Sequence, residues 1–565
     1  MQARASFEVQ IFHDGRWLLE DYCDTEVTAR AAAKSRSMKS GCQGVRILRN
    51  WTRADGVVTT QVIHSQRRAP EPARVGIVPI ESAPFCNKTS DFYRFESRST
   101  IGRICRRYVE QMFITPTELM HNYKALRRLQ DVDTLFVPAV DRVASLQARD
   151  AKMDAKLRRD QLYGAIAKLT DRARKADTHP NLPALVGSDF GKLVARIESL
   201  AQPGDADFFS LVVLSRDLIG RRSWLHKLQR LVELAQSQSG DKPLSLLDGV
   251  LADLLAVPTA LQDVLGQQRN LAEALCSMID LSEGRLGQTT GDAQAQITAI
   301  APLLAEGRLG ETRKSLMRTV TRQLSSQHAL CRDDRARERD AFRRVARRLF
   351  RPGGLMGGVE TAEALTRRSL AFQEEGGQAG LRKAVLGVTD SMGDSQFSVV
   401  YLLDLAGSKL GAELSGEILR HLTALMSGDL DQLVPRLPVR ERLTRATQIY
   451  ELIAAAVSID DAGRAQILTA LDEMLSRYLQ REAIIDKLDD PAAPLRDRAT
   501  RLIAFCAARV LPLESKAHKL ARERSIALLR QPNFEVQFVE GLEDQAQRDQ
   551  SLRSFYALLA RAGLR

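Results

Sequence analysis

The chain has 565 residues, enough for about four domains of roughly 150 residues each. Apolar residues make up 44%, charged residues 27% and aromatic residues 5%, and the formal net charge is +12. This balance is typical of a globular protein and is too apolar for a wholly disordered chain. No apolar run approaches the ~20 residues that span a bilayer, so we expect no transmembrane segment.

The N-terminus and the cysteines indicate a cytoplasmic location. The first residues lead directly into an alternating apolar and polar pattern and lack the apolar core of a secretory signal. The seven cysteines are an odd number, scattered from Cys23 to Cys506. A disulfide framework would be denser and even in number, so we expect reduced thiols.

The positive charge is concentrated in two segments. Residues 313–351 hold 13 basic and 4 acidic side chains, a net charge of +9, and residues 1–110 hold 18 and 12, a net charge of +6. Such concentration is typical of nucleic-acid-binding proteins. A general preference for arginine would produce the same excess, so charge alone does not decide between the two interpretations.

Residues 1–66 carry the β pattern of the chain. Apolar and polar side chains alternate from Phe7 to Ile11, the period expected of a half-buried strand. Asp14-Gly15 and Asp55-Gly56 suit the tight turns of two β-hairpins, because glycine and aspartate tolerate positive φ.

A helix is expected between the two hairpins. Asp24 or Thr25 can cap its start, and the pattern continues through Ser37 until Gly41. The segment therefore predicts a small ββαββ module, in which one helix covers a four-stranded antiparallel sheet. Four prolines and many polar residues in 67–97 predict a linker after the module.

The rest of the chain is predicted to be helical. Thr115-Pro116-Thr117-Glu118 has the pattern of a capping box at a helix start. Breaks follow one another at intervals of roughly 20–40 residues, which is typical of helix pairs or bundles. No consistent repeat motif aligns. Amphipathic helical segments are expected at 139–176, 189–201, 208–236, 244–256, 259–282, 395–426, 438–457, 461–487, 493–529 and 542–563.

The predicted fold is therefore mainly α. The small α+β module of residues 1–66 and the linker 67–97 precede two multi-helix bundle or irregular helical-repeat regions. The first, 98–351, ends in a long basic helix over 311–351, and the second, 352–565, begins with a glycine-rich hinge. The boundary is placed near residue 352, because Pro352, Gly353 and Gly354 together end a helix.

The basic helix 311–351 is the most distinctive segment. An apolar stripe of Phe342, Val345, Ala346, Leu349 and Phe350 predicts one buried face, which leaves guanidinium groups on the other. Residues 332–351 could bind nucleic acid or another polyanion, an acidic protein surface or an anionic membrane. The candidate contacts are Arg335, Arg339, Arg343, Arg344, Arg347, Arg348 and Arg351.

A simple solvated helix is the alternative for the same segment. Asp333–Arg337 and Asp340–Arg344 have the i,i+4 spacing of ordinary surface ion pairs. No aromatic residue stands among the arginines, which argues against binding of single-stranded nucleic acid.

The sequence predicts no catalytic, cofactor-binding or metal-ligating residues. It lacks a phosphate-binding P-loop, an H-E-x-x-H motif and a C-x-x-C pair, and Gly393–Phe397 misses the second glycine of a nucleophile elbow. His13, Cys23, Cys42 and His64 are spaced by 10, 19 and 22 residues, unlike the close pairs of a zinc site.

The glycine-rich zone 353–393 has two interpretations. Gly353–Gly358 could cradle an anion at a helix N-terminus, or the zone could be a flexible hinge. No strand precedes it and no lysine adjoins it, so the hinge is favoured.

We therefore expect a non-catalytic cytoplasmic scaffold or regulatory protein that binds other proteins. Leucine- and alanine-rich amphipathic helices without a cluster of acid and base residues favour this function. The alternatives are a nucleic-acid-associated regulator that uses helix 311–351, and an enzyme or nucleotide sensor built around 353–393.

Overall fold

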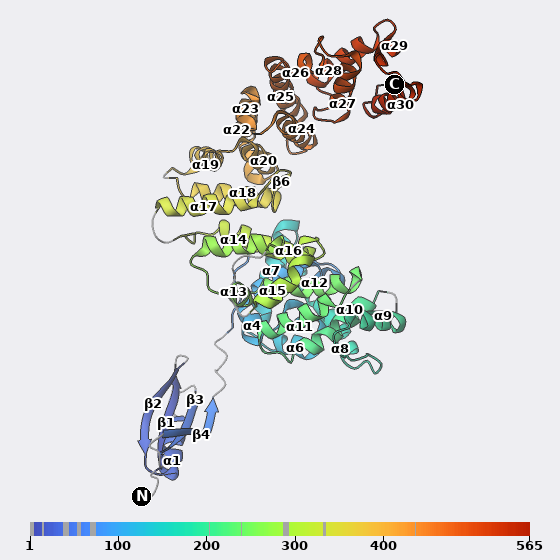
Figure 1. Cartoon of the computed structure of the whole chain (residues 1–565). Helices are drawn as coiled ribbons and strands as arrows, with labels where there is room; N and C mark the ends of the chain where they lie inside the picture. The colour runs from blue at the N-terminus through green and yellow to red at the C-terminus, as the bar shows by residue number, and fades with distance from the viewer. Residues whose placement is uncertain are drawn as a thin grey trace. The chain divides into compact units, whose positions relative to one another are not determined.

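The computed structural model describes residues 5–13, 16–37, 44–52, 58–67, 75–202, 204–238, 240–285, 293–331, 335–373, 375–435 and 437–564. The chain is 68% helical, with thirty helices among these residues and a small antiparallel sheet near the N-terminus (Figure 1). This confirms the predicted fold class. Two compact units are distinguished: residues 1–112 with 123–172, and residues 113–122 with 173–565.

The N-terminal module has the predicted ββαββ order. The four strands form an antiparallel sheet in the order β2-β1-β3-β4. The predicted turns at Asp14-Gly15 and Asp55-Gly56, and the predicted helix stop at Gly41, lie outside the described residues. The elements are β1 (Ala5–His13), β2 (Arg16–Cys23), α1 (Glu26–Ser37), β3 (Gly44–Thr52) and β4 (Val58–Arg67).

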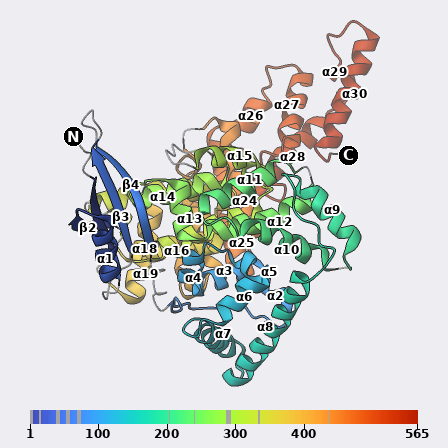
Figure 2. The ribbon, with the colours of Figure 1, turned by 90° about the horizontal axis from the view of Figure 1, so that it is seen from below.

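Helix α1 covers one face of this sheet (Figure 1, Figure 2). Phe7 and Val9 on β1 pack with Ala29 and Ala33 of α1, as the alternating pattern predicts. The Thr25 hydroxyl accepts a hydrogen bond from the backbone N–H of Thr28 at 3.2 Å, which caps the start of the helix.

Residues 75–88, in the second half of the predicted linker, have no helix or strand but are packed in place. Ile80 and Cys86 are buried. Arg142 donates to the Ile80 carbonyl at 2.6 Å, and Arg158 donates to the Cys86 carbonyl at 2.5 Å. The helices that follow in this part of the chain are α2 (Thr89–Phe92), α3 (Phe95–Ile104), α4 (Arg106–Met112), α6 (Tyr123–Gln130), α7 (Phe136–Ala151) and α8 (Ala155–Asp177).

The larger unit is built from helices that pack largely in chain order. Its first helices are α5 (Pro116–His121), α9 (Phe190–Leu200), α10 (Ala206–Leu218), α11 (Trp224–Gln236), α12 (Asp241–Leu255), α13 (Pro258–Leu265), α14 (Leu271–Ser282), α15 (Gln294–Ala305), α16 (Gly310–Leu324) and α17 (Arg335–Leu349). Helix α12 packs on α16, and α14 packs on both α16 and α17.

A short hairpin of β5 (Phe350–Arg351) and β6 (Gly354–Leu355) follows α17. Helix α16 packs on α18, α18 on α20, α20 on α22, α22 on α25, α25 on α28, and α27 on α30. These later helices are α18 (Gly358–Leu370), α19 (Gly377–Met392), α20 (Ser395–Ala406), α21 (Lys409–Glu413), α22 (Ser415–Ser427), α23 (Leu430–Leu433), α24 (Val439–Ala455), α25 (Asp461–Arg481), α26 (Ile484–Leu488), α27 (Leu495–Ala507), α28 (Lys516–Leu529), α29 (Phe534–Phe538) and α30 (Gln545–Arg561).

Several long predicted segments are each divided in the structure. Segment 208–236 becomes α10 and α11, and 259–282 becomes α13 and α14, because short turns interrupt the apolar pattern without shifting it. The amphipathic segments expected from the sequence do not include the glycine-rich zone, which contains α18 and α19. Gly393, with positive φ, follows the last residue of α19, where that conformation terminates a helix. Gly357, also with positive φ, precedes the first residue of α18.

The capping box predicted at Thr115 is confirmed. The Thr115 hydroxyl accepts from the Glu118 N–H at 3.2 Å, and the Glu118 carboxylate accepts from the Thr115 N–H at 2.8 Å. The other carboxylate oxygen of Glu118 is paired with the Lys227 ammonium, and both side chains are buried. Burial lowers the pKa of Lys227, which the neighbouring carboxylate opposes.

Two buried aspartates cap helices that come much later in the chain. Asp248 of α12 accepts from the N–H groups of Glu311 and Thr312 in the first turn of α16, at 2.8 and 2.9 Å. Asp472 of α25 does the same for the first two residues of α28, at 2.7 and 3.2 Å. Each carboxylate satisfies amides that have no partner within their own helix.

No single helix among the described residues is long and apolar enough to cross a membrane. Helices α12 and α13 reach that length and apolarity only as a pair, and the chain bends by 94° between them.

The caps lead to a stability prediction. Replacing Asp248 with alanine leaves two buried amides without an acceptor, so we expect the free energy of local opening of α16 to fall by about 1–3 kcal/mol. Asp248→Asn keeps one acceptor and should have a smaller effect. Hydrogen exchange over 310–324 measures the change. The exposed Asp263 provides the control, since Asp263→Ala should alter opening by less than about 0.5 kcal/mol. Equal protection in Asp248→Ala and Asp263→Ala would contradict the role of the cap.

Candidate interaction site on the basic helix

The basic segment is two helices rather than the single helix predicted over 311–351. Helix α16 ends at Leu324, and α17 begins at Arg335. The Glu338 carboxylate accepts from the N–H groups of Leu330 and Cys331, at 2.9 and 2.6 Å, and holds the connection against α17. The prediction was wrong because the polar turn after Leu324 contains neither proline nor glycine, the usual signals of a break.

The predicted apolar stripe is buried from Phe342 to Leu349, whereas Phe350 belongs to β5 and is only half-buried. Phe342, Val345 and Leu349 are each at most 1% exposed, and the Phe342 ring meets that of Phe372 edge-on with centroids 5.7 Å apart. Since the stripe fixes the rotation of α17, it also determines which arginines face which neighbour.

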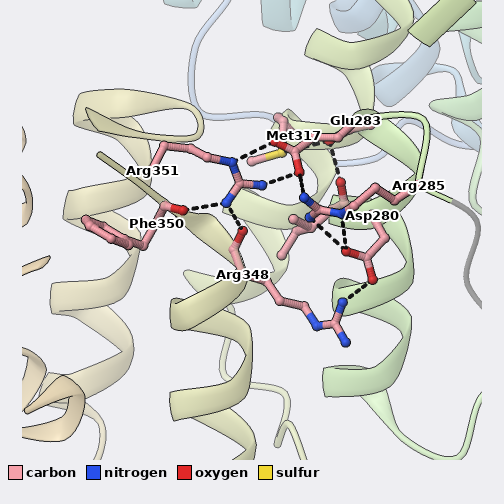
Figure 3. Close-up of polar contacts among 9 residues, drawn as sticks. Asp280, Glu283, Arg285, Met317, Arg348, Phe350 and Arg351 are labelled. Atoms are coloured by element: carbon pink, nitrogen blue, oxygen red, sulfur yellow. Dashed lines mark hydrogen bonds and ion pairs between the residues drawn. The ribbon is translucent and has the colours of Figure 1, made fainter. Parts of the chain in front are cut away.

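One row of arginines on α17 faces the acidic side of α14. Arg344 lies 3.4 Å from the Glu273 carboxylate, and Arg348 pairs with Asp280. Arg351, which follows α17 in β5, pairs with Glu283 (Figure 3). The predicted Asp340–Arg344 pair is therefore wrong, and Asp333 lies outside the described residues.

The α14–α17 clamp, defined as Asp280, Glu283, Arg285, Arg348 and Arg351, ties the two helices together where α17 ends. Arg285 bridges the two carboxylates, with 2.9 Å to Asp280, and Figure 3 shows both carboxylates turned toward the guanidinium groups. Arg351 also donates to the Arg348 carbonyl at 2.9 Å, which helps to satisfy the C-terminus of α17. The two carboxylates are only 13% and 14% exposed, so these pairs are shielded better than ordinary surface pairs.

A second row of arginines points away from α14. Arg339, Arg343 and Arg347 are spaced by four residues, so they lie on one side of α17, and all three are exposed. Arg343 pairs with Asp340 at 3.2 Å. Within the described ranges, Arg339 and Arg347 have neither an ion-pair nor a hydrogen-bond partner. The side chain of Arg335, the remaining candidate, lies outside the described part.

The carboxylates of α14 were missed in the sequence because they belong to a different predicted segment. Their own spacing was a usable signal: Glu273, Asp280 and Glu283 are separated by seven and three residues, which places them on one helix face. A nearby thiol, Cys276 on α14, has a pKa raised by burial, so it is a weak nucleophile.

The glycine-rich zone begins at the β5–β6 hairpin, which is held by a carboxylate. Asp404 of α20 accepts from the Leu355 N–H at 2.8 Å, and burial raises the pKa of Asp404. The Leu355 amide is therefore committed to this carboxylate.

Arg368 of α18 connects the chain on the two sides of residue 352. Its buried guanidinium donates to the carbonyls of Gln323, Leu324 and His328 at 2.8–2.9 Å and so satisfies the C-terminus of α16. Burial lowers the pKa of Arg368. Packing is continuous across the predicted boundary near residue 352, and that boundary remains a prediction.

Of the four residues weighed for a metal site, only Cys23 and His64 have side chains in the described part. Cys23 packs against the core of the sheet module. Cys42 and the side chain of His13 lie outside the described residues. Among the residues that are described, no group of three or more histidine, cysteine or acidic side chains is placed to hold a metal ion.

Comparison with protein-family models, curated proteins and solved structures finds no match to this chain. The candidate function is therefore argued from the residues alone.

The α14–α17 clamp leads to a second prediction. Arg351→Gln should lower the free energy of local opening of α14 and α17 by about 1–3 kcal/mol, because it leaves the shielded Glu283 carboxylate with Arg285 as its one remaining arginine partner among the described residues. Hydrogen exchange over 271–282 and 335–349 measures the change. A double-mutant cycle with Glu283→Gln should give a coupling of at least about 0.5 kcal/mol.

Arg347→Gln is the matched control for Arg351→Gln. It removes an arginine of α17, the helix that directly precedes Arg351, and Arg347 has no partner among the described residues, so exchange should be unchanged. Equal effects of the two substitutions would show that the clamp contributes nothing specific.

Proposed function

We propose that the chain is a non-catalytic cytoplasmic helical scaffold or regulatory protein that binds other proteins. The observation that carries the proposal is the packing of α9–α30, in which most helices contact near neighbours in the chain. Proteins built this way expose long side-chain surfaces without needing an enclosed reaction site, and they commonly bind other proteins.

The roles of the buried ionisable side chains support the same function. Lys227 is committed to Glu118, and Arg368 to the carbonyls that end α16. Asp489 is paired with Arg498 at 2.7 Å and with Arg524. Groups held in this way stabilise helix contacts and are not free to exchange protons with a substrate.

The N-terminal module is proposed as an accessory recognition domain. On the sheet face opposite α1, Glu8 accepts hydrogen bonds from Asn50 at 2.6 Å and Gln10 at 3.0 Å. Around these polar groups, Tyr22 and Val62 are 68% and 52% exposed. Large apolar side chains on an exposed sheet face favour contact with another protein.

This proposal predicts a stoichiometric complex. The tagged full chain, captured from extracts of its source cells, should retain a protein partner that co-elutes at constant ratio in size-exclusion chromatography. Replacing Tyr22 and Val62 with serine should weaken capture about tenfold if the sheet face contributes roughly 1.4 kcal/mol. Val457, 95% exposed on a different element, gives the control Val457→Ser.

The outcomes of this experiment separate the two parts of the proposal. Loss of the partner in the Tyr22 and Val62 variant, with capture retained in Val457→Ser, supports the recognition role of the module. Equal capture by all variants rejects that role. Absence of any stoichiometric partner rejects the scaffold function.

A nucleic-acid-associated regulator is the second candidate, favoured by the outward row of Arg339, Arg343 and Arg347. Each phosphate contact contributes about −0.9 to the slope of log affinity against log salt. Replacing the three arginines with glutamine should therefore reduce that slope for duplex DNA or RNA by about 2–3, measured by fluorescence anisotropy.

Arg420, an exposed arginine on α22, provides the control for this measurement. Arg420→Gln should leave the salt slope within about one phosphate equivalent of the original protein. Binding that is unchanged in the triple variant would remove α17 as the nucleic-acid contact.

A further inference from the structure

A groove of about 970 Å³ opens beside the N-terminal half of α17. It is lined by α13, the turn at 266–270, α14, α16, residues 328–331 and α17, all within the larger unit. Gly266, with φ of +66°, turns the chain after α13 and places Arg269 on the rim. This volume lies at the upper end of the range of about 300–1,000 Å³ that is usual for ligand sites.

The groove lining combines polar side chains with an apolar part on its inner wall. Leu261, Leu265, Met278 and Leu330 line it, and each of them is less than 10% exposed. These side chains come from α13, α14 and the connection between α16 and α17. An occupant with apolar groups therefore matches this part of the lining better than a phosphate chain does.

The rim has an excess of positive charge. Four arginines and two carboxylates line the groove, a formal excess of two positive charges. Both carboxylates already have arginine partners: Glu273 lies 3.4 Å from Arg344, and Asp340 lies 3.2 Å from Arg343. Arg269 is exposed and, among the described residues, has no hydrogen-bond or ion-pair partner.

We infer that this groove binds an acidic amphipathic segment of a partner protein. Apolar side chains at helical spacing fill the inner wall, and carboxylates on the flanks of the segment meet the arginine rim. Charge complementarity selects an acidic partner, and the apolar wall selects a peptide over a polyanion. The inference rests on the proposed scaffold function and names the chemistry of one partner.

A designed peptide tests the inference with the full-length protein. The probe is a labelled helical peptide with leucine along one face and glutamate along the other. One control peptide replaces every glutamate with lysine, and the other replaces every leucine with serine. Fluorescence anisotropy should give saturable binding of the acidic amphipathic peptide, with affinity at least about tenfold weaker for either control, a difference of roughly 1.4 kcal/mol.

Arg269→Glu should weaken binding of the acidic peptide about tenfold, since it reverses a charge on the rim. Arg347→Glu is the matched control, because Arg347 is an exposed arginine that does not line the groove. Circular dichroism confirms that both variants are folded. Unchanged affinity in Arg269→Glu overturns the inference.

The remaining outcomes are also decisive. Equal binding of all three peptides, no binding of the acidic peptide at millimolar concentration, or its complete displacement by duplex DNA overturns the groove inference. A partner protein captured equally by the original chain and by Arg269→Glu leaves the scaffold function in place and rejects this groove as its contact.

Discussion

Buried carboxylates hold together helices of the larger unit that are separated by many residues in the sequence. The first turn of a helix has amides without internal partners, and burying that turn is costly unless an acceptor is supplied. Asp248 supplies it for α16 and Asp472 supplies it for α28. The apolar faces can therefore close on one another without leaving the helix ends unsatisfied, and the positions of neighbouring helices follow from these contacts.

The rotation of α17 about its axis determines which of its arginines form ion pairs within the protein and which are exposed to solvent. Its apolar stripe faces the core, so one row of arginines meets the carboxylates of α14 while the other row faces away. A high count of arginines consequently overstates the charge available to a partner. Among the arginines of α17 whose side chains are described, Arg339 and Arg347 stay open, and Arg269 is open on the rim of the groove beside α14.

Patterns within a single element and the ββαββ arrangement of the N-terminal module could be predicted from the sequence, whereas the contacts between the later helices could not. The alternation from Phe7 to Ile11 and the capping box at Thr115 depend on neighbouring residues, and both were found. The break between α16 and α17 was missed because it depends on Glu338, which accepts from amides seven and eight residues earlier. The ion pairs of α17 were missed because their partners precede it by about seventy residues.

One long-range feature did leave a sequence signal. Asp248 and Asp472 share a local pattern in which leucine stands one residue before and three and seven residues after the aspartate, and these leucines are all buried. A leucine-rich helix with one aspartate on its buried side indicates an acceptor for another helix. Overall composition does not reveal such a residue, because it counts a buried aspartate and a solvent-exposed aspartate alike.

The guanidinium of Arg368 limits how the polypeptide can be divided for expression. A fragment that stops at residue 351 would lack the donor that satisfies three carbonyls at the end of α16, together with the Phe372 ring that covers Phe342. Such a fragment would expose apolar surface and tend to aggregate. To isolate smaller fragments, the chain is better divided at solvent-exposed turns. Such a turn should accept no hydrogen bond from a side chain on the other side of the cut.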